Sequence, residues 1–139
     1  MSFSGQEPAA TLETVLVVEA EVIVRTAIAQ YLRDCGYRVL EAGDANQAIT
    51  ILQEPEIRVD VVLSGIDFSG PMDGFDLSHW VKTHSPSTDV FLAATVQRAA
   101  STAGDLCEEG PMLSKPYQPE TAVERIKQLL AERARRKPK

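Results

Sequence analysis

The chain has 139 residues, of which 44% are hydrophobic and 24% charged, and its net charge is −6. These values predict one folded domain and exclude a disordered chain, and the acidic body argues against nucleic-acid binding by the domain itself. The sequence contains no apolar run long enough to cross a membrane and no signal-peptide pattern, so we expect a cytoplasmic protein.

The first half of the chain predicts two repeats of a strand followed by a helix. After a polar leader over 1–13, the continuous apolar run 15–18 predicts a buried strand. Apolar residues then recur at spacings of three and four over 24–35, which predicts a helix that stops at Gly36. A short strand over 37–40 follows, and Asp44 is placed to cap a second helix.

The second half repeats this alternation around the apolar run 61–64, which we expect to be the central strand. The remaining predicted elements are a helix around 77–84, a strand over 90–94, a weak helix over 99–107, a strand over 111–114 and a helix over 120–132. Five strands that alternate with five helices predict a (βα)5 α/β fold, which is a doubly wound five-stranded parallel sheet in a three-layer α/β/α sandwich. The flavodoxin-like strand order would be 2-1-3-4-5.

Two other groups of residues favour structural roles. Cys35 and Cys107 are far apart and lack a Cys-x-x-Cys spacing, so buried thiols are favoured over a disulfide or a metal site. His79 and His84 are five residues apart on a predicted helix, a spacing that does not favour a metal pair. Residues 133–139 form a basic tail, most simply a solubilising terminus.

Polar and small residues follow the predicted strands, at the edge where parallel sheets bind ligands. Three segments, VLVVEAE at 15–21, DVVLSGIDFSGPMDG at 60–74 and LSKP at 113–116, occur in this order. Together they resemble the receiver domain of bacterial response regulators, and the resemblance extends over about 14–130 within a domain of 14–132. The resemblance implies a domain that accepts a phosphoryl group from a phosphohistidine on a kinase. In such receivers the acceptor is an aspartate at the end of the third strand.

The resemblance also implies a Mg²⁺ site, which this sequence departs from. Family members hold the metal with an acidic pair after the first strand and with the acceptor aspartate, because Mg²⁺ prefers hard oxygen ligands. Glu19 matches the first acid, but Ala20 stands at the second and Gly65 at the phosphoacceptor position. We therefore expect a metal site at Glu19 that is weak or lost, and no cofactor.

The other positions of the pocket are only partly retained. Ala94 stands where the family has a Ser or Thr, with Thr95 next to it, and Met112 stands at the aromatic switch position. Lys115, followed by proline, matches the lysine that holds phosphoryl oxygens. With its usual competitors replaced, we expect Lys115 to pair with Glu19.

The sequence thus predicts a stand-alone, degenerate receiver in phosphorelay signalling that has no enzymatic activity and acts by protein interaction. The expected partner is a histidine kinase, another receiver or a separate output protein, and a homodimer is possible. One alternative is a working phosphoacceptor that uses Asp67, which would require the central strand to slip by two residues. Another is a small-ligand sensor that uses the vacated pocket.

Overall fold

The computed structural model describes residues 13–108, 127–128 and 131. None of the helices in these ranges is long and apolar enough to cross a membrane. The predicted fifth strand lies outside the described residues, and the described positions 127, 128 and 131 of the predicted last helix are helical. The elements are β1 (Thr14–Val18), α2 (Val22–Asp34), β2 (Arg38–Ala42), α3 (Ala45–Leu52), β3 (Val61–Ser64), α4 (Gly74–His84), β4 (Asp89–Leu92) and α5 (Val96–Glu108).

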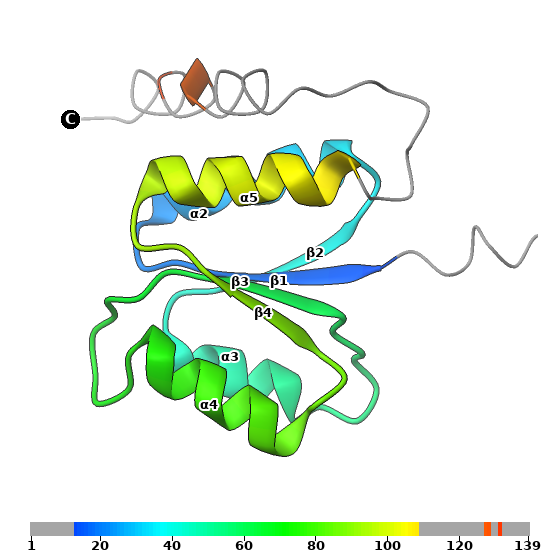
Figure 1. Cartoon of the computed structure of the whole chain (residues 1–139), viewed down its shortest axis with the longest axis vertical. Coiled ribbons are helices and arrows are strands. Elements are labelled where there is room, and N and C mark those ends of the chain that lie inside the picture. The colour runs from blue at the N-terminus through cyan, green and yellow to red at the C-terminus, as the bar shows by residue number, and fades with distance from the viewer. Residues whose placement is uncertain (1–12, 109–126, 129–130, 132–139) are drawn as a thin grey trace, which may run out of the picture.

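The four described strands form one parallel sheet in the order β2-β1-β3-β4. Helices α2 and α5 cover one face of the sheet, and α3 and α4 cover the other (Figure 1). The predicted doubly wound, flavodoxin-like α/β/α architecture is therefore confirmed, with the place of the fifth strand outside the described part. In the register, Val18 is paired with both Ala42 and Ser64.

The sheet separates two hydrophobic clusters, which explains why the central strands are continuously apolar. On β1, Val15 and Val17 belong to the cluster under α2 and α5, whereas Leu16 and Val18 belong to the cluster under α3 and α4. All four side chains are at most 1% exposed. A strand that is covered on both faces has no solvent side that could carry polar residues.

Local signals fix several helix ends as the sequence predicted. The Asp44 carboxylate accepts the N–H of Gln47 at 2.9 Å and caps α3. Asp73 and Asp76 form a reciprocal capping box at the start of α4, with distances of 2.9 and 3.0 Å. Gly36 has φ of 100°, the left-handed conformation that ends a helix at little cost to glycine.

Three boundaries differ from those expected. Strand β2 extends to Ala42 because its end pairs with Val18, and β4 ends at Leu92 instead of Ala94. Helix α5 begins at Val96, ahead of the expected range 99–107, because Thr95 Oγ1 accepts the N–H of Arg98 at 3.1 Å and caps the first turn.

The prediction for the cysteines is wrong, because Cys35 and Cys107 form a disulfide with a Cα–Cα distance of 5.5 Å. Cys35 is the C-cap residue of α2, and Cys107 lies in the last turn of α5. The two helices pack into the same cluster, which brings together residues that are 72 positions apart. The spacing of Cys35 and Cys107 in the sequence does not indicate that they lie close together in the fold.

Candidate functional site

The carboxyl ends of β1, β3 and β4 bring the predicted pocket residues to one edge of the sheet. The N–H of Gly65 donates to the carbonyl of Val18 at 2.9 Å, and the N–H of Ala93 donates to the carbonyl of Ser64 at 2.8 Å. The residues that follow these strands are therefore neighbours. They include Glu19 and Ala20 after β1, Gly65 after β3, and Ala94 and Thr95 after β4.

The side chain of Glu19 leans over Gly65. Its Oε1 atom lies 3.1 Å from the position that a Cβ atom at Gly65 would take. Its Oε2 atom accepts the backbone N–H of Glu21 at 3.0 Å, which fixes the direction of the carboxylate. The space beside the strand end is thus partly taken by an acid from the neighbouring strand.

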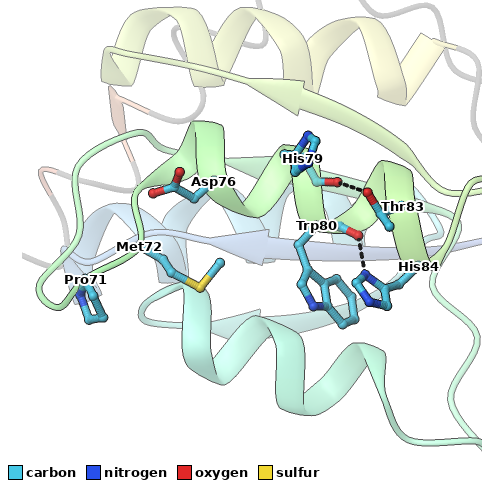
Figure 2. A pocket seen from close by; sticks show the side chains of 7 residues that line it. All are labelled: Pro71, Met72, Asp76, His79, Trp80, Thr83 and His84. Atoms are coloured by element: carbon cyan, nitrogen blue, oxygen red, sulfur yellow. Dashed lines mark hydrogen bonds between the residues drawn. The ribbon is translucent and has the colours of Figure 1, made fainter.

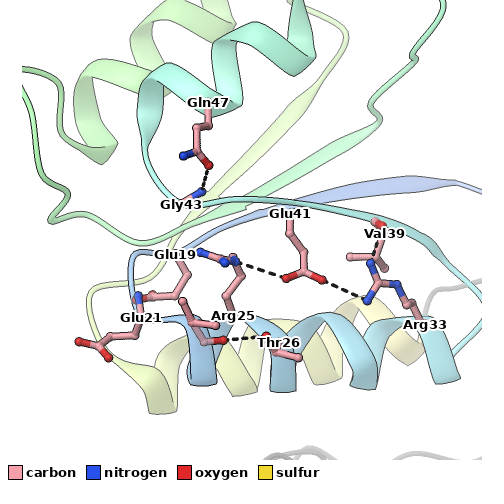
Figure 3. A network of polar contacts seen from close by, with 10 residues as sticks. Glu19, Glu21, Arg25, Thr26, Arg33, Val39, Glu41, Gly43 and Gln47 are labelled. Atoms are coloured by element: carbon pink, nitrogen blue, oxygen red, sulfur yellow. Dashed lines mark hydrogen bonds and ion pairs between the residues drawn. The ribbon is translucent and has the colours of Figure 1, made fainter.

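An arginine that the sequence reasoning missed supports the loop after β1. Arg25 Nη1 donates to the backbone carbonyl of Glu19 at 2.9 Å, and its Nε lies 3.3 Å from Glu41 Oε1 (Figure 3). The other oxygen of Glu41 pairs with Arg33 at 3.1 Å. The sequence did carry a sign of this contact. Arg25 lies in the first turns of α2, directly after β1, and the acid Glu41 lies in the neighbouring strand β2. Arg25 ties α2, β2 and the Glu19 loop together.

The start of α4 packs tightly against the end of β3. The N–H of Gly74 donates to the carbonyl of Ile66 at 2.7 Å, and a Cβ at Gly74 would lie 2.8 Å from the Cα of Ile66. The carbonyl of Gly65 accepts the Ser64 hydroxyl at 2.7 Å. Both backbone oxygens after the strand are therefore already hydrogen-bonded, and α4 can approach this closely only because position 74 is a glycine.

The residues at this edge do not fit a Mg²⁺ site. An octahedral magnesium ion usually needs one or two carboxylates together with other oxygen ligands. Ala20 and Gly65 supply no side-chain oxygen, and the Glu19 carboxylate already accepts a backbone N–H. Within the described residues, no group of three or more His, Cys, Asp or Glu side chains could hold a metal ion.

The other predicted site residues have separate surroundings. Asp67 is exposed in the loop after β3, and because Ser64 pairs with Val18, Gly65 is the residue that directly follows the paired strand. Ala94 and Thr95 are exposed, and Thr95 is engaged as a helix cap. Lys115 and Met112 lie outside the described residues, so the expected ion pair of this lysine stays a prediction.

A hollow lies beside α4 and the loop that precedes this helix. In Figure 2 the rings of Trp80 and His84 lie face to face, with a centroid distance of 4.3 Å. His84 Nδ1 donates to the carbonyl of Trp80 at 3.0 Å. The hollow has a volume of about 520 Å³ and is lined by Pro71, Met72, Asp76, His79, Trp80, Thr83 and His84.

Comparisons with known proteins agree with this architecture. A family model described as the response regulator receiver domain matches residues 15–127. The transcriptional regulatory protein AruR of Pseudomonas aeruginosa is 30% identical over 124 residues, which are 87% of this chain and 50% of that protein. A cyclic di-GMP phosphodiesterase of Thermotoga maritima is 35% identical over 80 residues, which are 57% of this chain and 20% of that protein.

Among solved structures, the chemotaxis response regulator CheY4 of Vibrio cholerae is similar with a TM-score of 0.56 and 25% identity. The similarity covers 86% of this chain and 99% of that chain. The chain spans half or less of the length of the curated relatives that it matches. These similarities concern the domain and not the whole activity of the longer relatives.

Proposed function

Because the chain belongs to the response regulator receiver domain family, we propose that it is a receiver of two-component signalling that works without phosphorylation of its central strand end. The observation that carries this proposal is the pair Glu19 and Gly65. Gly65 has no oxygen nucleophile, and the Glu19 carboxylate leans into the space beside it. Phosphoryl transfer also needs positive charge to stabilise the transition state, and the residues present do not fit the magnesium ion that usually supplies it.

The proposed mode of action is binding to another protein through the edge at which β1, β3 and β4 end. Three of the exposed large hydrophobic residues lie in the first turns of the helices that follow β1, β3 and β4, namely Val22, Phe75 and Val96. Their exposed fractions are 59%, 59% and 41%. The amino ends of α2, α4 and α5 all lie at this edge, on the left of Figure 1. We call these three residues the apolar rim.

The apolar rim is proposed to be part of a protein interaction surface, where apolar contact supplies affinity and polar neighbours supply specificity. The partner is proposed to be a histidine kinase, another receiver or a separate output protein. The domain itself is proposed to have no enzymatic activity. The relative named a phosphodiesterase is matched over only 20% of its length. Most of that protein therefore has no counterpart in this chain, and its name is no support for such an activity here.

Phosphorylation is tested by incubating the full chain with Mg²⁺ and a small phosphodonor and measuring its mass. We expect no phosphoryl adduct. A stable adduct would contradict the proposal. If that adduct disappears in Asp67→Asn, the alternative acceptor Asp67, which is exposed two positions beyond Gly65, is established instead.

The rim is tested by capturing partners on the immobilised full chain from an extract of its source cells, with and without the phosphodonor. We expect Phe75→Ala to reduce capture of the same partner protein, and the phosphodonor to leave capture unchanged. Lys82→Ala is the matched control, because Lys82 is an exposed residue in the last turn of the same helix. Equal capture by both variants would place the interface elsewhere.

A further inference from the structure

The disulfide joins the ends of two helices inside the core. Cys35 ends α2 and Cys107 lies next to the end of α5, with exposed fractions of 0% and 1%. The Cα–Cα distance of 5.5 Å is within the range that a disulfide requires. Neither sulfur can react with an external reagent until the two helix ends separate.

The attachment of α5 to the core depends on its last turn, because the rest of its buried face consists of small side chains. The buried residues of α5 are Ala99, Ala100, Ala103, Gly104, Leu106 and Cys107. Alanine and glycine remove little apolar area from water, and the free energy of burial is roughly proportional to that area. The larger anchors, a leucine and the cysteine, are both in the last turn, so that turn contributes a large part of the attachment of the helix.

A buried hydrogen bond joins the same two segments. The Tyr37 hydroxyl donates to the backbone carbonyl of Leu106. Tyr37 lies just beyond Cys35, and Leu106 precedes Cys107 in the sequence. Opening this helix end therefore requires the loss of one buried hydrogen bond in addition to the apolar contacts.

We propose that Cys35 and Cys107 form a reversible redox switch that controls the attachment of α5 to α2. As a disulfide, the pair fixes the last turn of α5 against the end of α2. As two thiols, the pair leaves this turn held by Tyr37, Leu106 and small side chains, so the turn opens more often. The switch needs no phosphoryl group and does not depend on the function proposed above.

The chemistry is thiol–disulfide exchange with a low-molecular-weight disulfide such as oxidised glutathione. Because the buried face of α5 is small, its last turn opens more readily than the end of α2, and Cys107 is the thiol that reaches solvent first. Its thiolate attacks one sulfur of the small disulfide, and one small thiolate leaves. Cys35 then attacks Cys107 Sγ and releases the second small thiolate. Two protein thiols are oxidised, one small disulfide is reduced to two thiols, and the protons pass to the leaving groups.

The test equilibrates the full chain in glutathione buffers that range from strongly reducing to strongly oxidising, followed by acid quenching, alkylation in denaturant and mass spectrometry. We expect both cysteines to change from alkylated to protected together within this range. Two free thiols at the oxidising end, or a disulfide that survives the reducing end, would each overturn the proposal.

Hydrogen exchange measures the structural consequence. We expect the amides of 102–108 to exchange on the order of tenfold faster in the dithiol form than in the disulfide form, because local opening governs their exchange. Equal exchange in the two forms would show that the bond does not control the helix. A Cys35→Ala, Cys107→Ala variant should exchange at a rate that is independent of the glutathione ratio.

Tyr37→Phe supplies a test that keeps both cysteines. Loss of the hydroxyl removes the bond to Leu106, so the reduced variant should be alkylated under native conditions several-fold faster than the reduced wild type. An unchanged rate would show that the thiols do not become accessible through this helix end, and would contradict the proposed route.

Discussion

Glu19 Oε1 lies 3.1 Å from the point where a side chain at Gly65 would begin. The acid that follows β1 thus stands beside Gly65 after β3, the position that we propose corresponds to the acceptor acid of the family. The Glu19 carboxylate occupies part of the space that a side chain at position 65 would need. This contact predicts how the site responds when a carboxylate is introduced at position 65.

Gly65→Asp is expected to destabilise the protein at pH 7 more than Gly65→Asn does. The two side chains have similar shapes, but the aspartate adds a negative charge next to Glu19. The difference in unfolding free energy should be about 0.5–1 kcal/mol, the scale of partly exposed charge pairs. Urea unfolding of both variants measures this difference. In a Glu19→Gln background the difference should vanish, and its persistence would show that the two positions do not interact.

Gly74→Ala should be costly although alanine is the better helix former. The added Cβ would meet backbone atoms of Gly65 and Ile66, the latter at 2.8 Å, and backbone cannot move aside as a flexible side chain can. We expect a loss of about 1–3 kcal/mol, as for overpacked sites. Equal thermal stability of the Gly74→Ala variant and the wild type would contradict the tight approach.

Arg25→Met should destabilise the protein by about 1–2 kcal/mol, since it removes a hydrogen bond to a backbone carbonyl and an ion pair at a partly buried site. Arg58→Met is the matched control. Arg58 also pairs with an acid, Asp60, at 3.2 Å, but its side chain is 90% exposed compared with 19% for Arg25. Exposed pairs contribute about 0–1 kcal/mol. Chemical denaturation measures the unfolding free energy of both variants. An equal loss in Arg25→Met and Arg58→Met would contradict a stabilising role that is specific to Arg25.

Reduction of the Cys35–Cys107 disulfide should lower the melting temperature. The bond closes a loop with a sequence separation of 72, and disulfides typically contribute about 2–4 kcal/mol by restricting the unfolded chain. For a domain of this size the shift should be roughly 10 °C. Thermal melts with and without a thiol reductant measure it. A melting temperature that does not respond to the reductant would show that the bond does not form in the folded protein.

The sequence was sufficient to predict features that depend on local chemistry. Continuous apolar runs identified β1 and β3 because both faces of these strands are covered. Asp44, Asp73 and Gly36 signalled helix ends because capping depends on side chains within three or four residues. The alternation of strands and helices predicted a parallel sheet, and the order of the described strands is the one expected for the flavodoxin-like form of that sheet.

The features that were missed depend on contacts between distant segments. The Arg25–Glu41 pair requires the β1–β2 register, and the disulfide requires the packing of α2 against α5. The direction of the Glu19 side chain depends on its bond to the N–H of Glu21, which spacing does not reveal. The sequence places Thr95 beside the pocket residue Ala94 and gives no sign that it caps α5, so the predicted helix begins at 99 and not at Val96.

The division of the core by the sheet has a spectroscopic consequence. The sequence has a single tryptophan, Trp80, which packs with the cluster under α3 and α4, whereas the disulfide and Tyr31 lie in the cluster on the opposite face. Tryptophan emission therefore reports on the half of the molecule that lacks the covalent bond. If that half loosens first, the emission change will precede the loss of helical circular dichroism, and the protein will not unfold in a single two-state step.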